Sequence, residues 1–341
     1  MLLNKRKILH VTEAFGGGVT TAINTYVKHS NSFEHHLVAS VRSEDLTGEE
    51  LNGEFNSVKL VKRNLRGLFE CFSFVKKLNP DVIHLHSTYA GFFMRIHPFI
   101  DKSKIIYTPH GFAFLRDDNV LFKKVYYYIE HLLASKTKYI AGCGMDETNI
   151  ARSFGNKVNT HSLVNVCEPM VDKIKFSGSD RLKIGMIGRV TPQKGVDFFA
   201  SVASHLKNDV EFIWIGGGEQ EGVKLLESAG VTVTGWLTRP NVIKHLLNLD
   251  YYFHSAAWDG FPISVLEAAE VGLPIMLREI GPFSAENLSC VKDEDAAIDE
   301  IALLITLDRE ANYRLSQNSE NIRFTHTSEK LIEALKFIYN N

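Results

Sequence analysis

Two carboxylates flank a tight turn in the segment WDGFPISVLEAAEVGLP. Asp259 precedes the turn Gly260-Phe261-Pro262, and Glu267 lies in the helix that is predicted to follow it. Pro262 suits the first turn of a helix, where its missing N–H costs nothing. The backbone N–H groups from about Ile263 and Ser264 to Val265 are therefore expected to be unpaired at the positive end of the helix dipole. Two acids and an amide-rich turn can together grip a polyhydroxylated, phosphorylated ligand.

Two basic residues follow another predicted strand, in the segment GRVTPQKGVDFFASVA. Arg189 ends the strand expected at Leu182–Gly188, and Lys194 begins the next helix. Both charges should therefore gather at the carboxyl edge of a parallel sheet, where such sheets bind ligands. Two fixed cations there would stabilise a leaving diphosphate. The alternative is a pair of ordinary surface cations.

A glycine turn, Gly16, Gly17 and Gly18, joins a strand predicted at Lys7–Thr12 to a helix predicted at Val19–His29. Glycine lets backbone N–H groups approach a phosphate closely, and the helix N-terminus favours an anion. The turn lacks the spacing of the dinucleotide fingerprint and of the P-loop. A turn that serves packing alone is therefore the alternative interpretation.

Three histidines stand at the ends of predicted strands. His110 lies in TPHGF, after a strand expected at Lys104–Thr108, and Gly111 lets the chain turn so that the imidazole overhangs the ligand edge. His84 and His86 are two residues apart, so both point to one face of their strand. They could bind a metal, but no carboxylate or third histidine is spaced to complete the site. We predict a packed or rim position for this pair, and no metal.

The segment around Asp259 resembles the acidic-x7-acidic signature of retaining nucleotide-sugar glycosyltransferases, in the form found in glycosyltransferase family 4. The resemblance implies that Asp259 and the amides after Gly260 hold the donor sugar, and that Glu267 holds the ribose. The family more often has glutamate at the first position, which puts the sugar preference in doubt. The stretch from Arg189 to Lys194 resembles the family's GRxxxxKG element, which implies that both cations bind the donor phosphates.

The same resemblance assigns four further features. It implies that Gly16 to Gly18 face the diphosphate and that His110 contacts the sugar near the reacting carbon. It also implies that the turn containing Gly217 and the backbone near Trp236 border the nucleotide base. Trp236 lies in a strand that we predict at Val231–Leu237.

Strands and helices alternate along the whole chain, which predicts doubly wound parallel sheets of the α/β class. A length of 341 residues fits two domains. The resemblance implies the GT-B architecture, in which two Rossmann-like domains face each other across a cleft. We place an acceptor-side domain at 1–170 and a nucleotide-sugar domain at 171–325, and expect a helix at about 326–341 to cross back to the first.

Composition excludes several classes of protein. An apolar content of 45% with 23% charged residues is that of a globular protein, and a net charge of -2 argues against a nucleic-acid partner. Residues 1–170 carry 21 Lys and Arg against 16 Asp and Glu, a charge of +5, whereas the remainder carries -7. The 4 cysteines form no CxxC pair, which argues against a zinc site or a disulfide framework.

No apolar run is long enough for a signal peptide or a membrane span, so we predict a cytoplasmic protein. The segment Phe112–Lys138 combines aromatic and basic residues in a predicted amphipathic helix. Such helices more often cover a core, but this composition also suits a membrane interface. With the positive first half, it leads us to expect peripheral contact with the inner face of the plasma membrane.

The resemblance implies transfer, with retention, of a sugar from a nucleotide-diphosphate sugar, a UDP-sugar being favoured. The acceptor would be a saccharide or a lipid-linked oligosaccharide for a capsule, O-antigen, lipopolysaccharide or exopolysaccharide. Catalysis would fall to Asp259, Arg189, Lys194 and His110, without metal or other cofactor. Three alternatives remain: a UDP-sugar 2-epimerase of the same fold, a non-catalytic sugar-nucleotide-binding subunit, and an inverting transferase with His110 as base.

Overall fold

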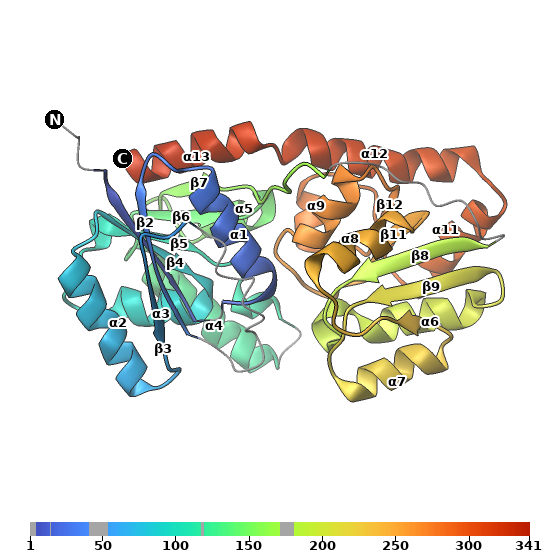
Figure 1. Ribbon diagram of the computed structural model, residues 1–341, viewed down its shortest axis with the longest axis horizontal. Helices are drawn as coiled ribbons and strands as arrows, with labels where there is room; N and C mark the ends of the chain where they lie inside the picture. The colour runs from blue at the N-terminus through green and yellow to red at the C-terminus, as the bar shows by residue number, and fades with distance from the viewer. Residues whose placement is uncertain (1–4, 14, 41–53, 117–118, 171–180) are drawn as a thin grey trace. The chain divides into compact units, whose positions relative to one another are not determined.

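The computed structural model describes residues 5–13, 15–40, 54–116, 119–170 and 181–341. The chain divides into two compact units (Figure 1). Unit 1 contains the described residues up to Val166 together with Thr327–Asn341, and unit 2 contains those from Cys167 to His326. Residues 171–180, which follow the predicted domain boundary, lie outside the described residues.

Unit 1 is built on a parallel sheet of seven strands in the order β3-β2-β1-β4-β5-β6-β7. The strands are β1 (Lys7–Thr12), β2 (Glu34–Ser40), β3 (Ser57–Val61), β4 (Val82–His86), β5 (Ile105–Thr108), β6 (Tyr139–Gly142) and β7 (Thr160–Ser162). Its helices are α1 (Gly17–Lys28), α2 (Leu65–Leu78), α3 (Ser87–Ile96), α4 (Val120–Ala134), α5 (Met145–Ser153) and α13 (Ser328–Asn340), with short 3₁₀ turns η1 (Lys102–Lys104) and η2 (Ala113–Leu115).

The central strands of unit 1 are apolar because helices cover both faces of the sheet. Strand β4, with the sequence VIHLH, is buried at every position, as parallel strands usually are. Different helices contribute to two separate apolar clusters. Leu331, Leu335 and Ile338 of α13 pack in the cluster that contains Ile8 of β1. Residues of α2 and α3 pack in the other cluster. The strand order reverses between β1 and β4, which makes this a doubly wound sheet.

Unit 2 repeats the plan with five parallel strands in the order β10-β9-β8-β11-β12. The strands are β8 (Leu182–Ile187), β9 (Val210–Ile215), β10 (Thr232–Val233), β11 (Tyr251–His254) and β12 (Ile275–Leu277). Its helices are α6 (Val196–Leu206), α7 (Gln220–Ser228), α8 (Arg239–Leu247), α9 (Ile263–Glu270), α10 (Gly281–Ala285), α11 (Glu294–Ile305) and α12 (Arg309–Thr325), with a 3₁₀ turn η3 (Pro192–Lys194).

The predicted α/β class with parallel sheets is confirmed, and two local expectations were wrong. The strand expected at Val231–Leu237 contains only Thr232–Val233, because the chain turns at Gly235, whose φ is 70°. The helix expected over Phe112–Lys138 spans only Val120–Ala134, and η2 precedes it. Among the described residues, no helix combines the length and the apolar content that crossing a membrane requires.

Candidate functional site

The carboxyl edge of the sheet in unit 2 collects most of the residues singled out in the sequence. The loops that follow β8, β9 and β11 leave the parallel sheet at this edge. The strand order reverses between β8 and β11, and ligands of doubly wound sheets bind beside such a reversal. The loop with Arg189 and Lys194 follows one of these two strands, and the turn with Asp259 follows the other.

Hydrogen bonds hold the two loops against each other. The hydroxyl of Ser255 donates to the carbonyl of Lys194 at 2.9 Å, and the amide of Ala257 donates to the carbonyl of Gln193 at 2.9 Å. Only glycine fits at Gly195, because its φ is 69° and a β-carbon would lie 2.0 Å from the carbonyl oxygen of Ser255. The fixed backbone therefore positions the side chain of Lys194.

Lys194 and Asp259 form an ion pair at this edge. Their side chains keep 16% and 17% of their surface exposed, so a ligand could reach both groups. Arg189 is exposed, and no described residue pairs with its guanidinium. Burial, followed by the positive charge of Lys194, lowers the pKa of nearby His254 well below its usual value. Lys194 and Arg189 therefore both supply positive charge at this edge, whereas His254 is neutral at pH 7.

The turn after Asp259 leads into α9, whose N-cap is Pro262. The amide of Val265 donates to the carbonyl of Pro262 at 3.2 Å, so the expectation that this amide is unpaired was wrong. The first turn of the helix closes one residue earlier than we expected. The amides of Ile263 and Ser264 have no acceptor among the described residues. Phe261 is buried against Phe283 and His326, which anchors the turn to unit 2.

Glu267 is buried inside unit 2, with 2% of its side chain exposed, so it is not an ordinary surface residue of the helix. It forms an ion pair with Arg239, whose side chain is half exposed. Burial raises the pKa of Glu267, and the charge of Arg239 opposes that rise. Sequence reasoning missed Arg239, although it opens α8 directly after the loop that contains Trp236.

The glycine turn after β9 lies against the loop after β8. The amide of Val190 donates to the carbonyl of Gly217 at 2.9 Å, and a β-carbon at Gly218 would lie 2.4 Å from the carbonyl oxygen of Val190. A β-carbon at Gly217 would lie 3.0 Å from the indole of Trp236, which is 71% exposed. The glycine turn therefore lies next to an exposed indole and against the loop that carries Arg189 and Lys194.

In unit 1, the predicted glycine turn forms the start of α1. Gly16 is the N-cap, and the helix begins two residues earlier than expected, so Gly17 and Gly18 lie in its first turn. Gly17 has a φ of 59° and faces open space, with no atom within 4 Å of a β-carbon placed there. Backbone N–H groups at this helix start are therefore accessible to an anion.

His110 follows β5 in unit 1 and has a φ of 52°, which is unusual for a residue other than glycine. Buried Glu147 holds this backbone, since its carboxylate accepts from the amide of Gly111 and, at 2.9 Å, from the amide of Cys143. Burial raises the pKa of Glu147, and these amide hydrogen bonds lower it. Sequence reasoning missed Glu147 because its partners lie on two separate loops.

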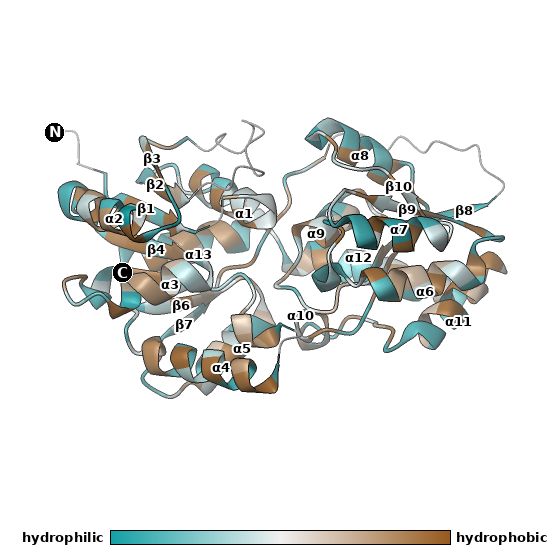
Figure 2. Ribbon diagram, turned by 90° about the horizontal axis from the view of Figure 1, so that it is seen from below, coloured by the Kyte–Doolittle hydropathy of each residue, from teal (hydrophilic) through white to brown (hydrophobic). Residues whose placement is uncertain are grey.

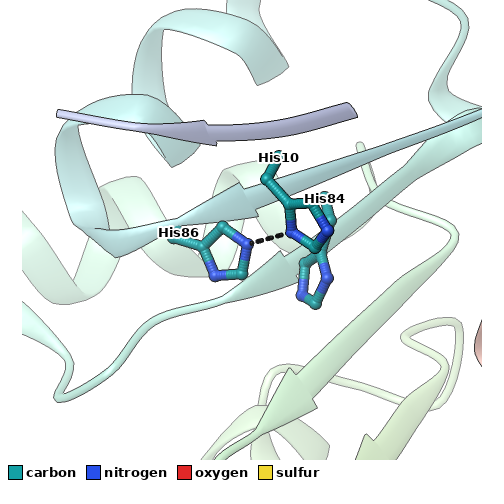
Figure 3. Close-up of side chains that lie close together, drawn as sticks. All are labelled: His10, His84 and His86. Carbon is teal, nitrogen blue, oxygen red and sulfur yellow. Dashed lines mark hydrogen bonds between the residues drawn. The ribbon is translucent and has the colours of Figure 1, made fainter. Parts of the chain in front are cut away.

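Three buried histidines of unit 1 come close together (Figure 3). His10 of β1 joins His84 and His86 of β4, and a ring nitrogen from each lies within 4.8 Å of the others. The expectation that no third histidine lies beside this pair was wrong, because the pairing of β1 with β4 brings His10 to it. Metal binding at these residues was not expected, and the absence of a metal stays a prediction.

Comparisons with known proteins bear on both units. Residues 181–306 match the family model described as Glycosyl transferases group 1. Anabaena HepE, in a structure with UDP-glucose, superposes with a TM-score of 0.78 at 14% identity, over 98% of this chain and 99% of that one. The fold is GT-B.

Two relatives extend over most of the GT-B chain. A 41.2 kDa protein of the cps region of Klebsiella pneumoniae is 27% identical over 293 residues, which cover 80% of this chain and 81% of that protein. The UDP-Gal:alpha-D-GlcNAc-diphosphoundecaprenol alpha-1,3-galactosyltransferase of Escherichia coli is 25% identical over 287 residues, covering 76% and 71%. Together with the domain match, they support a glycosyltransferase.

Proposed function

We propose that this protein is a retaining glycosyltransferase that moves a sugar from a UDP-sugar to a lipid-linked saccharide during synthesis of a surface polysaccharide. The observation that carries the proposal is the convergence at one sheet edge of Lys194, Arg189, Asp259 and the amides that begin α9. The name of the Escherichia coli relative, which gives a UDP-galactose donor and a diphosphoundecaprenol acceptor, supports this donor and acceptor class.

The arrangement provides for a leaving nucleoside diphosphate. Lys194 and Arg189 would bind its phosphates, and the amides of Ile263 and Ser264 would add uncharged donors where negative charge grows. Binding of the diphosphate would draw Lys194 from its ion pair. The freed carboxylate of Asp259 would then accept hydrogen bonds from hydroxyls of the sugar.

Retention follows if the leaving diphosphate helps to deprotonate the incoming hydroxyl on the same face of an oxocarbenium-like sugar. The groups that would stabilise the diphosphate are those of the protein itself, so the proposed mechanism requires no metal or cofactor. Glu267 would hold the ribose, with its ion pair to Arg239 keeping the buried carboxylate charged.

Nucleotide release tests the proposal. UDP-, GDP- and ADP-sugars are incubated with the protein, first alone and then with a cell membrane extract, and the free nucleotide is measured. We expect the extract to accelerate UDP release from one donor, and Glu267→Ala to abolish that acceleration. Glu270→Ala, a change in the same helix, is the matched control and should retain it.

Other outcomes of this experiment would overturn the proposal. Conversion of a donor without nucleotide release would indicate an epimerase. A donor that raises the melting temperature but never turns over with any extract would indicate a binding subunit. Nuclear magnetic resonance of the glycosidic product reads the anomeric configuration, and inversion would contradict the retaining mechanism.

A further inference from the structure

A row of histidines crosses the interior of unit 1 and ends at His110. His10 in β1, His35 in β2 and His86 in β4 are buried, and they lie side by side because their strands are neighbours in the sheet. Figure 3 shows two of them, His10 and His86, pointing toward each other. His110 adds the fourth imidazole, at the carboxyl edge of the sheet.

Hydrogen bonds join these four imidazoles end to end. Nδ1 of His35 lies 3.1 Å from Nε2 of His10. Nδ1 of His10 lies 3.0 Å from Nε2 of His86, and Nδ1 of His86 lies 3.0 Å from Nε2 of His110. Each contact therefore pairs an Nδ1 with the Nε2 of the next ring.

The inner end of the row is fixed by an acceptor. Nε2 of His35 lies 2.9 Å from the carbonyl oxygen of Ser30, and a carbonyl can only accept. The hydroxyl of Ser30, 3.1 Å from the same nitrogen, already donates to the carbonyl of Tyr26 at 2.5 Å, so it too can only accept from His35. His35 must carry its proton on Nε2.

Each ring in the row is neutral. Burial lowers the pKa of His10 and of His86 well below the usual value, and neighbouring histidines lower it further. Burial also lowers the pKa of His35, and it lowers the pKa of His110 to about 4. A neutral imidazole has one N–H and one acceptor nitrogen, so one fixed proton sets the direction of every bond in the row.

We propose that this row of histidines fixes His110 as the Nε2–H tautomer and thereby presents its Nδ1 as a hydrogen-bond acceptor. Since His35 is protonated on Nε2, its Nδ1 accepts from His10, which then accepts from His86, which accepts from His110. Nδ1 of His110 has no partner among the described residues. His35, His10 and His86 are positioning residues, since they act on a ligand only through His110.

The proposal deepens the proposed function and, for its ligand, rests on it. An acceptor nitrogen at His110 selects a group that donates, such as a sugar hydroxyl, and disfavours a phosphate or carboxylate oxygen. The imidazole would also be uncharged and unable to donate from Nδ1. His110 would therefore bind the sugar and not the diphosphate.

His84 lies in the same cluster but outside the row. Its two ring nitrogens lie 2.9 Å from the hydroxyl of Tyr339 and 2.8 Å from that of Thr108. Hydroxyls can donate or accept, so nothing sets its tautomer. A metal on His10, His84 and His86 would need to displace these hydrogen bonds, and zinc binding is therefore the outcome that competes with our proposal.

Tautomers can be read directly in the unliganded protein. Long-range ¹H–¹⁵N correlation spectra of the histidine rings, assigned by single substitutions, distinguish Nε2–H, Nδ1–H and doubly protonated forms. We expect His35, His10, His86 and His110 all to be Nε2–H at pH 7. An Nδ1–H or cationic form in any of them, or stoichiometric Zn²⁺ held by these rings, would overturn the proposal.

A matched pair of variants tests the positioning role. His10→Asn keeps an oxygen near the place of Nδ1 to accept from His86, whereas His10→Phe removes the acceptor. We expect His86 and His110 to keep their tautomers in the first variant and to show mixed tautomers in the second. His84→Phe removes a buried ring outside the row and should leave both unchanged.

Binding separates this proposal from the proposed function. With UDP-glucose as the probe, His10→Phe should weaken binding by about threefold to tenfold, the effect of one neutral hydrogen bond, and His10→Asn should restore it. If the tautomers are as expected but no sugar is transferred, the proposed function fails and the row of histidines stands. If transfer occurs with other tautomers, only the row fails.

Discussion

At the scale of single residues, the ion pair between Lys194 and Asp259 concentrates opposite charges where a diphosphate and a sugar would meet. The types of these residues and the segments that carry them were evident in the sequence. Their contact was not, because it depends on the pairing of β8 with β11. Arg239 and Glu147 escaped sequence reasoning for the same reason, since each acts on a group from another element.

Replacement of Lys194 tests its catalytic role. Lys194→Ala should lower turnover by about 10²–10³, the usual cost of losing one group that stabilises charge in the transition state. Steady-state kinetics, with the donor that the nucleotide-release experiment identifies, measure this loss of turnover. Lys224→Ala removes an exposed lysine of α7 in the same unit and should leave turnover unchanged. An unaltered rate for Lys194→Ala would remove this residue from the mechanism.

The ion pair of Glu267 predicts a dependence of stability on pH. Burial raises the pKa of Glu267 in the folded state, so its proton stabilises the fold at low pH and that stabilisation is lost as the pH rises through the folded pKa. Arg239 opposes the rise. Arg239→Ala should therefore lower the melting temperature more at pH 8 than at pH 5, measured by calorimetry. An equal loss at both values would show that Glu267 does not depend on Arg239 for its charge.

At the scale of elements, α5 and the loop after β5 act together. The carboxylate of Glu147 in α5 accepts two backbone hydrogen bonds, one of them from the residue after His110. The left-handed conformation of His110 is therefore maintained from a helix, whose Glu147 lies 36 residues after Gly111 in the chain. The sequence predicted a turn at this place from Gly111, but it could not indicate what stabilises the turn.

Glu147→Gln should lower both the free energy of unfolding and the turnover. A glutamine side chain has one oxygen and one NH₂ group, so one of the two amides would face a donor, at a cost of about 1–3 kcal/mol. Chemical unfolding measures the stability, and turnover should fall with it because His110 loses its position. Asp146→Asn, the neighbouring change on the same helix, is the control. Wild-type turnover in Glu147→Gln would show that the position of His110 does not depend on Glu147.

At the scale of the whole molecule, unit 1 exposes an apolar stripe along α4, much of which is hydrophobic in Figure 2. Five exposed residues share one helix face: Leu121, Phe122, Val125, Tyr128 and Leu132. Val120 and Tyr127 of the same helix are exposed as well. Buried Glu130, paired with Arg95 at 2.7 Å, holds the other face to the unit. The sequence predicted this amphipathic segment but placed the start of its helix too early, because Asn119, inside the predicted segment, is the N-cap.

We propose that this stripe contacts the membrane surface, where a lipid-linked acceptor would lie. Flotation with liposomes of anionic lipid should recover the protein at low salt and less of it at high salt, because lysines on the segment contribute. The double variant Phe122→Ser and Leu132→Ser should abolish flotation. The double variant Lys76→Ser and Lys77→Ser, on α2, removes positive charge outside the stripe and is the control. Absence of lipid binding at low salt would contradict the proposal.

The return of α13 to unit 1 has a consequence for synthesis on the ribosome. Leu331, Leu335 and Ile338 complete an apolar cluster with Ile8 and Val82, yet they are translated after all of unit 2. Unit 2 is continuous in sequence and can fold as soon as it has left the ribosome. Unit 1 must instead wait with part of its apolar surface uncovered, so the first half of the nascent chain is the half that needs protection by a chaperone.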